Sequence, residues 1–133
     1  MQLNFIANRS QPSNSGRTIP VIDPSDGQPF DEIARSDASD IDAAVRAARQ
    51  AWDSGWHKTT AVDRGRLLMK LSGKVAAHAD ELAALEQRDC GKPVKQARAD
   101  VMALVRYFEF YAGACDKLHG ETIPYLDGYS VLT

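Results

Sequence analysis

The sequence has few cysteines, no long apolar run and no excess of charge of one sign. Its two cysteines, Cys90 and Cys115, are too few for a disulfide framework, so we expect free thiols in a cytoplasmic protein. No apolar stretch approaches the roughly 18 residues of a membrane span, and the N-terminus lacks the basic and apolar parts of a signal peptide. A net charge of −2 provides no basic face. We therefore expect neither nucleic acid nor membrane as a partner.

The common local signatures of an active site are also absent. There is no glycine-rich phosphate loop, and no histidine stands at metal-ligand spacing from a cysteine or glutamate. Cys90 precedes Gly91 and Lys92, near a helix start and a cation, which are features of reactive thiols. The favoured alternative is a buried or half-buried structural cysteine, and Cys115, on an apolar helix stripe, is expected to pack. The residues alone predict no complete active site.

The first 35 residues consist of short extended runs separated by turns. Residues 3–5 alternate apolar and polar side chains, which is the period of a half-buried strand. The β-branched run 18–22 contains Pro20, which favours an edge strand because proline has no N–H to donate. A Pro-Ser-Asp-Gly turn at 24–27 returns the chain through 29–33. This pattern predicts a β-hairpin.

Two amphipathic helices are predicted next. Ser39 is expected to cap the first, in a capping box with an aspartate, and Gly55 to end it. Thr60 is expected to cap the second. Trp52 and Trp56 flank Gly55 and are expected to pack in the core or at helix ends. The apolar residues at helical spacing are Ile41, Ala44, Val45, Ala48 and Trp52 in the first helix and Leu67, Leu68, Leu71 and Val75 in the second.

The chain direction changes at residues 89–93. A short helix over 80–89 is predicted to end at Gly91, because glycine readily takes the left-handed conformation of a helix end. Pro93 is expected at the first position of a long helix that runs to about Leu118. Aromatic residues lie on more than one face of this helix, which indicates packing on two sides. Its predicted buried stripe is Val94, Ala97, Val101, Val105, Phe108, Ala112 and Cys115.

After Gly120 apolar side chains again recur at every second residue, as in a strand. Asp127-Gly128 predicts a hairpin turn. The strand pattern still runs at Thr133, with no cap or turn residue after it. We therefore expect that the last strand lacks a partner within this sequence and that the chain is cut from something longer. We also expect an apolar face to remain uncovered.

Taken together and in order, these motifs resemble the N-terminal portion of the aldehyde dehydrogenase superfamily. Each segment alone is weak evidence for the resemblance. So many of them in the same order are specific to this superfamily. The segments that carry the resemblance are Asn4-Phe5-Ile6, Val21-Ile22-Asp23-Pro24 with Gly27, Asp42-Ala43-Ala44-Val45, Ala47-Ala48-Arg49, Arg64-Gly65-Arg66-Leu67-Leu68, Glu81-Leu82-Ala83-Ala84-Leu85-Glu86, Asp89-Cys90-Gly91-Lys92-Pro93, Tyr111-Ala112-Gly113, Asp116-Lys117 and His119-Gly120-Glu121-Thr122-Ile123-Pro124.

The resemblance implies a fold class. We expect an α+β chain with an N-terminal β-hairpin, four helices and a C-terminal strand pair, forming part of the α/β aldehyde dehydrogenase fold. Residues 1–35 would be the N-terminal strands and hairpin, and residues 36–120 the helical layer of the cofactor-binding domain. Residues 121–133 would begin the oligomerisation arm. The implied partners are the remainder of a longer chain and identical subunits in a homodimer or homotetramer.

The resemblance also implies an activity. Family members oxidise an aldehyde to a carboxylic acid with NAD or NADP: a cysteine thiolate attacks the carbonyl, hydride passes to the nicotinamide and a glutamate activates water. Neither Cys90 nor Cys115 lies in the context of the family's catalytic cysteine, and no catalytic or cofactor-binding residue of the family falls within this sequence. These residues alone are therefore expected to be inactive. The alternative is a non-catalytic helical module for binding or assembly.

One family site within the chain is a monovalent cation site. Many members hold Na⁺ or K⁺ with oxygens from the hairpin and from the aspartate before Gly-Lys-Pro, which implies Val21, Ile22 and Asp89 here. An apolar residue contributes only its backbone carbonyl, and oxygen is the ligand that hard cations prefer. The alternative for Asp89 is a local cap or ion pair.

A second family site is the substrate entrance, which the first half of the long helix lines. The matching residues here are Ala99, Asp100 and Ala103. A carboxylate at this entrance would suit a polar or cationic aldehyde, such as a betaine- or amino-type aldehyde. The alternative for Asp100 is an exposed helix aspartate without a ligand role.

Overall fold

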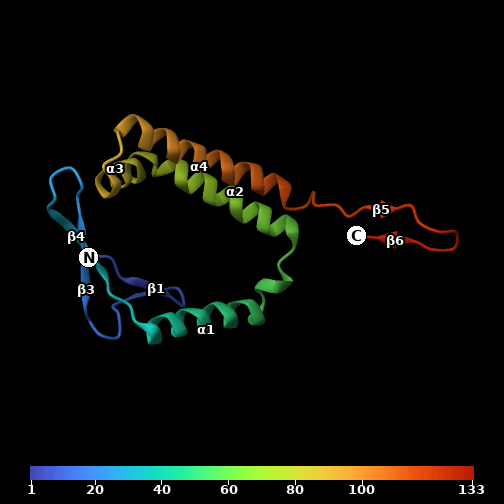
Figure 1. Cartoon of the computed structure of the whole chain (residues 1–133), viewed down its shortest axis with the longest axis horizontal. Coiled ribbons are helices and arrows are strands. Elements are labelled where there is room, and N and C mark those ends of the chain that lie inside the picture. Colours follow the sequence, from blue (N-terminus) through green and yellow to red (C-terminus); the bar gives the residue numbers. More distant parts are fainter.

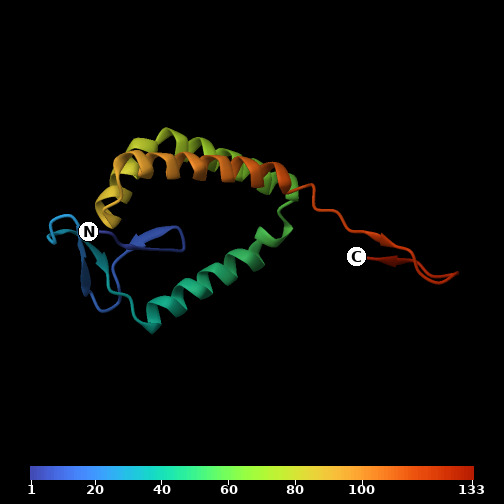
Figure 2. The ribbon, with the colours of Figure 1, turned by 45° about the horizontal axis from the view of Figure 1, so that its top comes forward.

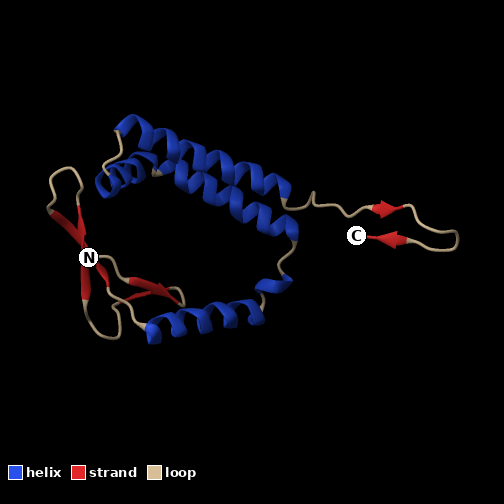
Figure 3. Ribbon diagram, in the orientation of Figure 1, coloured by secondary structure: helices blue, strands red, loops and turns tan.

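The computed structural model describes all 133 residues, and it confirms the predicted α+β class (Figures 1 and 3). The strand β2 is an element that the sequence did not predict. The strands are β1 (Asn4–Ile6), β2 (Arg9–Gln11), β3 (Thr18–Ile22), β4 (Pro29–Ala34), β5 (Thr122–Ile123) and β6 (Val131–Leu132). The helices are α1 (Ala38–Ser54), the short 3₁₀ helix η1 (Trp56–Lys58), α2 (Ala61–Ala77), α3 (Ala79–Cys90) and α4 (Val94–Ala114).

Strands β3 and β4 form the predicted hairpin. They pair antiparallel, with Ile22 opposite Pro29 and a register shift just before that pair. The turn is closed by the Asp23 N–H, which donates to the Gln28 carbonyl at 2.9 Å, and by the Gly27 N–H, which donates to the Asp23 carbonyl at 2.8 Å. Pro20 lies in β3, which pairs with β4 alone and is therefore an edge strand, so its missing N–H breaks no central ladder.

The prediction that Ser39 caps α1 is wrong. Asp37 is the cap: its carboxylate accepts from the N–H groups of Ser39 at 2.8 Å and Asp40 at 3.3 Å. The Asp40 carboxylate accepts in return from the Asp37 N–H at 3.0 Å. A carboxylate accepts a backbone hydrogen bond more strongly than a hydroxyl does, which places the capping box two residues earlier. Gly55 ends α1 as predicted.

Helices α2 and α4 run antiparallel side by side, and α3 lies at one end of the pair (Figures 1 and 2). Thr60 caps α2 as predicted, accepting from the Asp63 N–H at 3.1 Å. Ser72 is buried between the two long helices and donates to the Val105 carbonyl at 3.1 Å. The small apolar core of this three-helix unit is Val75, Ala83, Ala97, Val101 and Val105.

The corner between α3 and α4 follows the prediction closely. Gly91 has φ of 65° and ends α3 in the left-handed conformation. Pro93 caps α4 instead of standing at its first position. Helix α4 ends at Ala114, earlier than predicted, and Leu118 is 89% exposed. No apolar contact stabilises a further turn there. Val94 is also exposed, because it lies in the first turn, beyond the reach of the core.

Much apolar surface is uncovered, as predicted. The accessible surface is 10282 Å² for 14.6 kDa, whereas a compact monomer of this mass exposes about 6,900 Å². Only 10 of the 133 residues are buried, so the chain is an open layer and not a closed core. Leu67 and Leu71, which the helical spacing places on one face of α2, are exposed. Large apolar side chains are exposed at Ile41, Val45 and Trp52 on α1, Leu67, Met69 and Leu71 on α2, and Tyr107, Phe110 and Tyr111 on α4.

Strands β5 and β6 form a hairpin that extends away from the helices (Figure 2). Its turn contains Gly128 with φ of 84°, as the Asp-Gly signal predicts. The prediction that the last strand lacks a partner is wrong, because β6 pairs with β5 and the Thr133 N–H donates to the Glu121 carbonyl at 3.0 Å. None of the helices combines the length and the apolar character that crossing a bilayer requires.

Candidate functional site at the hairpin–helix corner

The turn of the β3–β4 hairpin meets the C-terminal end of α3. Arg88 Nε lies 3.7 Å from Asp23 Oδ2, and the Arg88 guanidinium carbon lies 4.4 Å from the centre of the Phe30 ring. At Gly91 the hairpin comes so close that a Cβ would stand 3.1 Å from Cγ of Pro24. Two segments far apart in sequence therefore meet at one corner.

A hollow of about 560 Å³ lies between the hairpin and α3. It brings together Val21 and Asp89, two of the three residues implied as cation ligands, while Ile22 is next to this lining in sequence but is not part of it. The lining combines five apolar residues with four acidic ones. The lining residues are Gln2, Val21, Phe30, Asp31, Ile33, Glu81, Leu82, Leu85, Glu86 and Asp89.

Of the four acidic residues in this lining, Asp89 alone makes no hydrogen bond or ion pair through its carboxylate. The other three are engaged: Glu81 by His78 at 3.0 Å, Glu86 by Lys92, and Asp31 by the amino group of Met1 at 2.6 Å. That amino group, with the Gln2 amide, holds the pKa of Asp31 far below its usual range. Asp89 stands in the last turn of α3, where the helix dipole also favours a cation.

The ladder of the hairpin is irregular next to this hollow: its register shifts between Val21 and Ile22, just before the Asp23 N–H that donates to the Gln28 carbonyl. No group of three or more His, Cys, Asp or Glu side chains is arranged to hold a metal ion. A cation at this corner would therefore depend on backbone carbonyls together with one carboxylate, which suits a monovalent ion better than a divalent one.

Asp100, implied at the substrate entrance, is held by two neighbours. Lys92 Nζ lies 2.7 Å from its Oδ2 and also contacts the Glu86 carboxylate, and the Gln96 amide donates to its Oδ1 at 2.8 Å. The Lys92 ammonium, followed by the Gln96 amide, lowers the pKa of Asp100, while the two carboxylates raise the pKa of Lys92. The Asp100 charge is therefore compensated, and Lys92 links the end of α3 to the start of α4.

The other two implied entrance residues flank Asp100 on α4. Ala99 and Ala103 are one helical turn apart and exposed, and Asp100 is rotated by about 100° from Ala99 and by about 60° from Ala103. Ala103 borders a groove of about 500 Å³ whose other lining residues are Arg106, Tyr107, Phe110 and Tyr111.

Replacing Lys92 with methionine should change the pH dependence of stability. In the native chain the pKa of Asp100 is lowered, so its ionised form stabilises the fold. This stabilisation is complete above the ordinary aspartate pKa and is lost as the pH falls through the lowered pKa. Without Lys92, the first cause of the lowered pKa, only the Gln96 amide still lowers it. The variant should therefore melt at a lower temperature near neutral pH, and the difference should shrink towards about pH 3. Thermal melts across this range measure it.

Lys95→Met is the matched control for that experiment, because Lys95 lies one residue after Val94 in α4 and its ammonium makes no ion pair or hydrogen bond. It should show no such convergence with the native chain. An equal difference between Lys92→Met and the native chain at every pH would contradict a role for the Lys92 bridge.

Neither cysteine is placed for nucleophilic catalysis. Cys90 is exposed, and not buried or half-buried as the favoured alternative held, and its thiol donates to the Glu86 carbonyl at 3.0 Å. Cys115 is half-buried, as a packing role predicts, and donates to the Tyr111 carbonyl at 3.2 Å. Each thiol is thus hydrogen-bonded to the backbone carbonyl four residues before it. No side-chain base contacts either sulfur.

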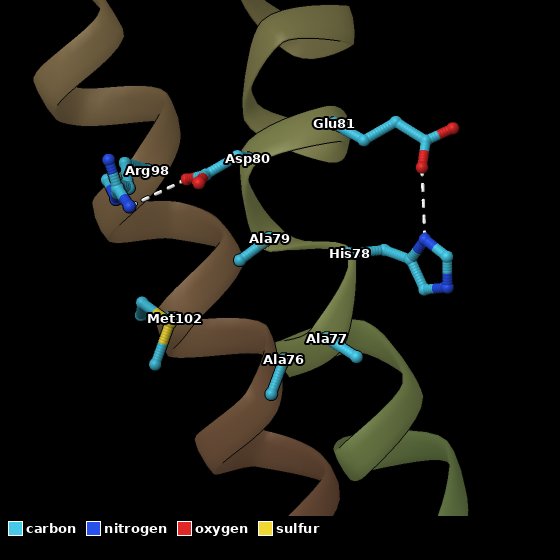
Figure 4. A pocket seen from close by; sticks show the side chains of 8 residues that line it. All are labelled: Ala76, Ala77, His78, Ala79, Asp80, Glu81, Arg98 and Met102. Carbon is cyan, nitrogen blue, oxygen red and sulfur yellow. Dashed lines mark hydrogen bonds and ion pairs between the residues drawn. The ribbon is translucent and has the colours of Figure 1, made fainter.

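A second hollow, of about 320 Å³, lies at the junction of α2 and α3 (Figure 4). Its charged side chains pair with one another: His78 Nδ1 lies 3.0 Å from Glu81 Oε2, and Arg98 Nη2 lies 2.7 Å from Asp80 Oδ1. In Figure 4 the Arg98–Asp80 pair and the His78–Glu81 pair lie on opposite sides of the view, with Ala79 between them and Met102 below Arg98. No charged group is left for a ligand, so the hairpin–helix corner is the stronger candidate.

Known proteins match this chain over nearly its whole length. The sequence profile described as "Aldehyde dehydrogenase family" matches residues 11–133, which is nearly the entire chain. This chain belongs to the aldehyde dehydrogenase family. The structural comparison agrees: the crystal structure of a putative aldehyde dehydrogenase from Burkholderia cenocepacia superposes with a TM-score of 0.90 at 59% identity, covering 98% of this chain and 27% of that one.

Other members of the family match at lower identity. Aldehyde dehydrogenase family 2 member B4, mitochondrial, from Arabidopsis thaliana is 45% identical over 91% of this chain and 23% of its own length. Retinal dehydrogenase 2 from Homo sapiens is 42% identical over 97% of this chain and 26% of its own length. Betaine aldehyde dehydrogenase from Staphylococcus aureus, solved in complex with NAD⁺, has a TM-score of 0.87 at 30% identity, covering 93% of this chain and 25% of that one. The chain thus spans about a quarter of the length of these aldehyde dehydrogenases.

Proposed function

We propose that this chain is the N-terminal part of an NAD(P)-dependent aldehyde dehydrogenase, which oxidises an aldehyde to a carboxylic acid through a cysteine thiohemiacetal. The observation that carries the proposal is the match over residues 11–133, supported by the structural likeness to the Burkholderia cenocepacia protein. The matching relatives are named for retinal, benzaldehyde and betaine aldehyde. They support the aldehyde class without favouring one aldehyde.

In this proposal the chain is a scaffold for machinery that other residues supply. Residues 1–35 are the N-terminal strands and hairpin, 36–120 the helical layer of the cofactor-binding domain, and 121–133 the start of the oligomerisation arm of a homodimer or homotetramer. The projecting β5–β6 hairpin supports the last assignment. NAD or NADP is bound elsewhere in the protein, for which we propose a cytoplasmic location because both cysteines are free thiols.

The proposed substrate entrance consists of Ala99 and Ala103, with Asp100 beside them. The groove next to Ala103 has aromatic walls, and its Phe110 and Tyr111 rings meet edge to face with centres 5.3 Å apart. The Asp100 carboxylate already pairs with Lys92, so its charge contributes less to a preference for cationic aldehydes than a free carboxylate would.

The test of the proposed function is a chimera. This chain replaces the corresponding first part of the Burkholderia cenocepacia protein, and NADH formation is followed with NAD and a panel of aldehydes. The chimera should turn over at least one aldehyde, whereas the 133-residue chain alone should form no NADH. Turnover by the chain alone would contradict the proposal that other residues supply the reactive groups. A folded chimera without any activity would favour the alternative, a non-catalytic module for binding or assembly.

The proposed cation site consists of the Val21 and Ile22 carbonyls and the Asp89 carboxylate, and it holds Na⁺ or K⁺. It predicts that KCl raises the melting temperature of the chimera above that in choline chloride of equal concentration. Asp89→Asn should remove most of this difference. Asp53→Asn, which changes another exposed and unpaired aspartate, on α1, should leave it intact. Equal K⁺ dependence in the two variants would exclude Asp89 as a ligand.

A further inference from the structure

Arg88 makes the one side-chain ion pair that joins the β3–β4 hairpin to the helices. Its partner Asp23 is only 17% exposed in its side chain, and no side-chain hydrogen bond links this hairpin to α3. The remaining contact near Pro24 and Gly91 is apolar. The polar attachment of the hairpin to the end of α3 therefore depends on this arginine.

The guanidinium engages both sides of the hairpin turn at once. Asp23 follows β3, and Phe30 lies in β4 with its ring centre 4.4 Å from the guanidinium carbon. The Asp23 carboxylate is oriented in advance, because it accepts from the Ser25 N–H at 2.8 Å and from the Ser25 hydroxyl at 2.6 Å. A planar guanidinium can stack on a ring while it faces a carboxylate, which the ammonium of lysine cannot do equally well.

The two residues of this ion pair are sequence neighbours of the proposed cation ligands. Asp23 follows Ile22 directly, and Arg88 precedes Asp89 directly. We infer that Arg88 is a positioning residue: it fixes the hairpin on the end of α3 and thereby sets the spacing between the hairpin carbonyls and the Asp89 carboxylate. The positioning role rests on the proposed cation site, whereas the tether itself does not.

Hydrogen exchange of the full chain tests the tether. Loss of one exposed cation–π contact and one exposed ion pair should make the amides of residues 18–34 exchange about fivefold faster in Arg88→Met. Arg88→Lys should fall between this variant and the native chain. Arg98→Met is the control, because Arg98 is similarly exposed and ion-paired but contacts Asp80 and not the hairpin. Unchanged exchange in Arg88→Met would overturn the inference.

Melting of the chimera in KCl and in choline chloride tests the positioning role. Arg88→Met keeps Asp89 but should lose most of the K⁺-dependent rise in melting temperature, whereas Arg98→Met should keep it. A native chimera without any K⁺ effect would refute the proposed cation site, and with it the positioning role, even where exchange shows the tether. Faster exchange with an undiminished K⁺ effect would refute the positioning role alone.

Discussion

Replacing Gly65 with alanine is expected to lower the free energy of unfolding by about 1–2 kcal/mol, although alanine forms helices better than glycine. Gly65 lies in α2 where this helix touches α4, and a Cβ there would stand 2.6 Å from the backbone oxygen of Ala112. That oxygen belongs to the backbone of α4 and cannot rotate away like a flexible side chain. The two helices must therefore separate, which loosens the core between them.

Gly73→Ala is the matched control, because Gly73 lies in the same helix and has no atom within 4 Å of the position of a Cβ. It should be neutral or stabilising by up to about 1 kcal/mol, the difference in helix propensity. Denaturant unfolding of both variants measures the contrast. Equal stability of the two would show that α2 and α4 do not approach each other so closely in solution.

Val101→Ala is expected to cost about 2–3 kcal/mol, because it removes two buried methyl groups and leaves a cavity. Val101 is 5% exposed and belongs to the cluster formed with Val75, Ala83, Ala97 and Val105. The core has only five buried residues, and only the partly buried Ala79, Leu82 and Phe108 pack against it. The loss should therefore be a large part of the total stability.

Val94→Ala is the control for this substitution, since the same change is made in the same helix at a residue that is 56% exposed. It should change the stability by less than about 0.5 kcal/mol. Equal losses at Val94 and Val101 would contradict the placement of the core, because the sequence stripe alone does not distinguish the two residues.

Local signals predicted most of the elements. Helical spacing, Thr60 and Gly91 set the bounds of α2 and α3, since caps and left-handed glycines act within a few residues. The stop of α4 at Ala114 was not predicted, because it depends on whether anything packs against Leu118. The pattern gives no exposure for Leu67 for the same reason: helical spacing identifies an apolar face but not what covers it.

The candidate site was predicted from resemblance, and its supporting contacts were not. Val21 and Asp89 were implied as ligands, and the structure brings both to one hollow. Arg88 and Lys92 had no predicted role, because the Arg88 partners in the hairpin are far away in sequence and the Lys92 bridge to Asp100 crosses a helix corner. No periodic signal connects such residues. Only the folded corner shows them in contact.

The central claim is that this chain is an open layer of the aldehyde dehydrogenase fold, with apolar faces that contact other parts of that fold. Small-angle scattering of the isolated chain, with circular dichroism and a dye that fluoresces on apolar surface, tests it directly. We predict a helical chain with a radius of gyration well above the roughly 14 Å of a compact domain of this length, and strong dye binding. A helical particle of about 14 Å that binds no dye would contradict the claim.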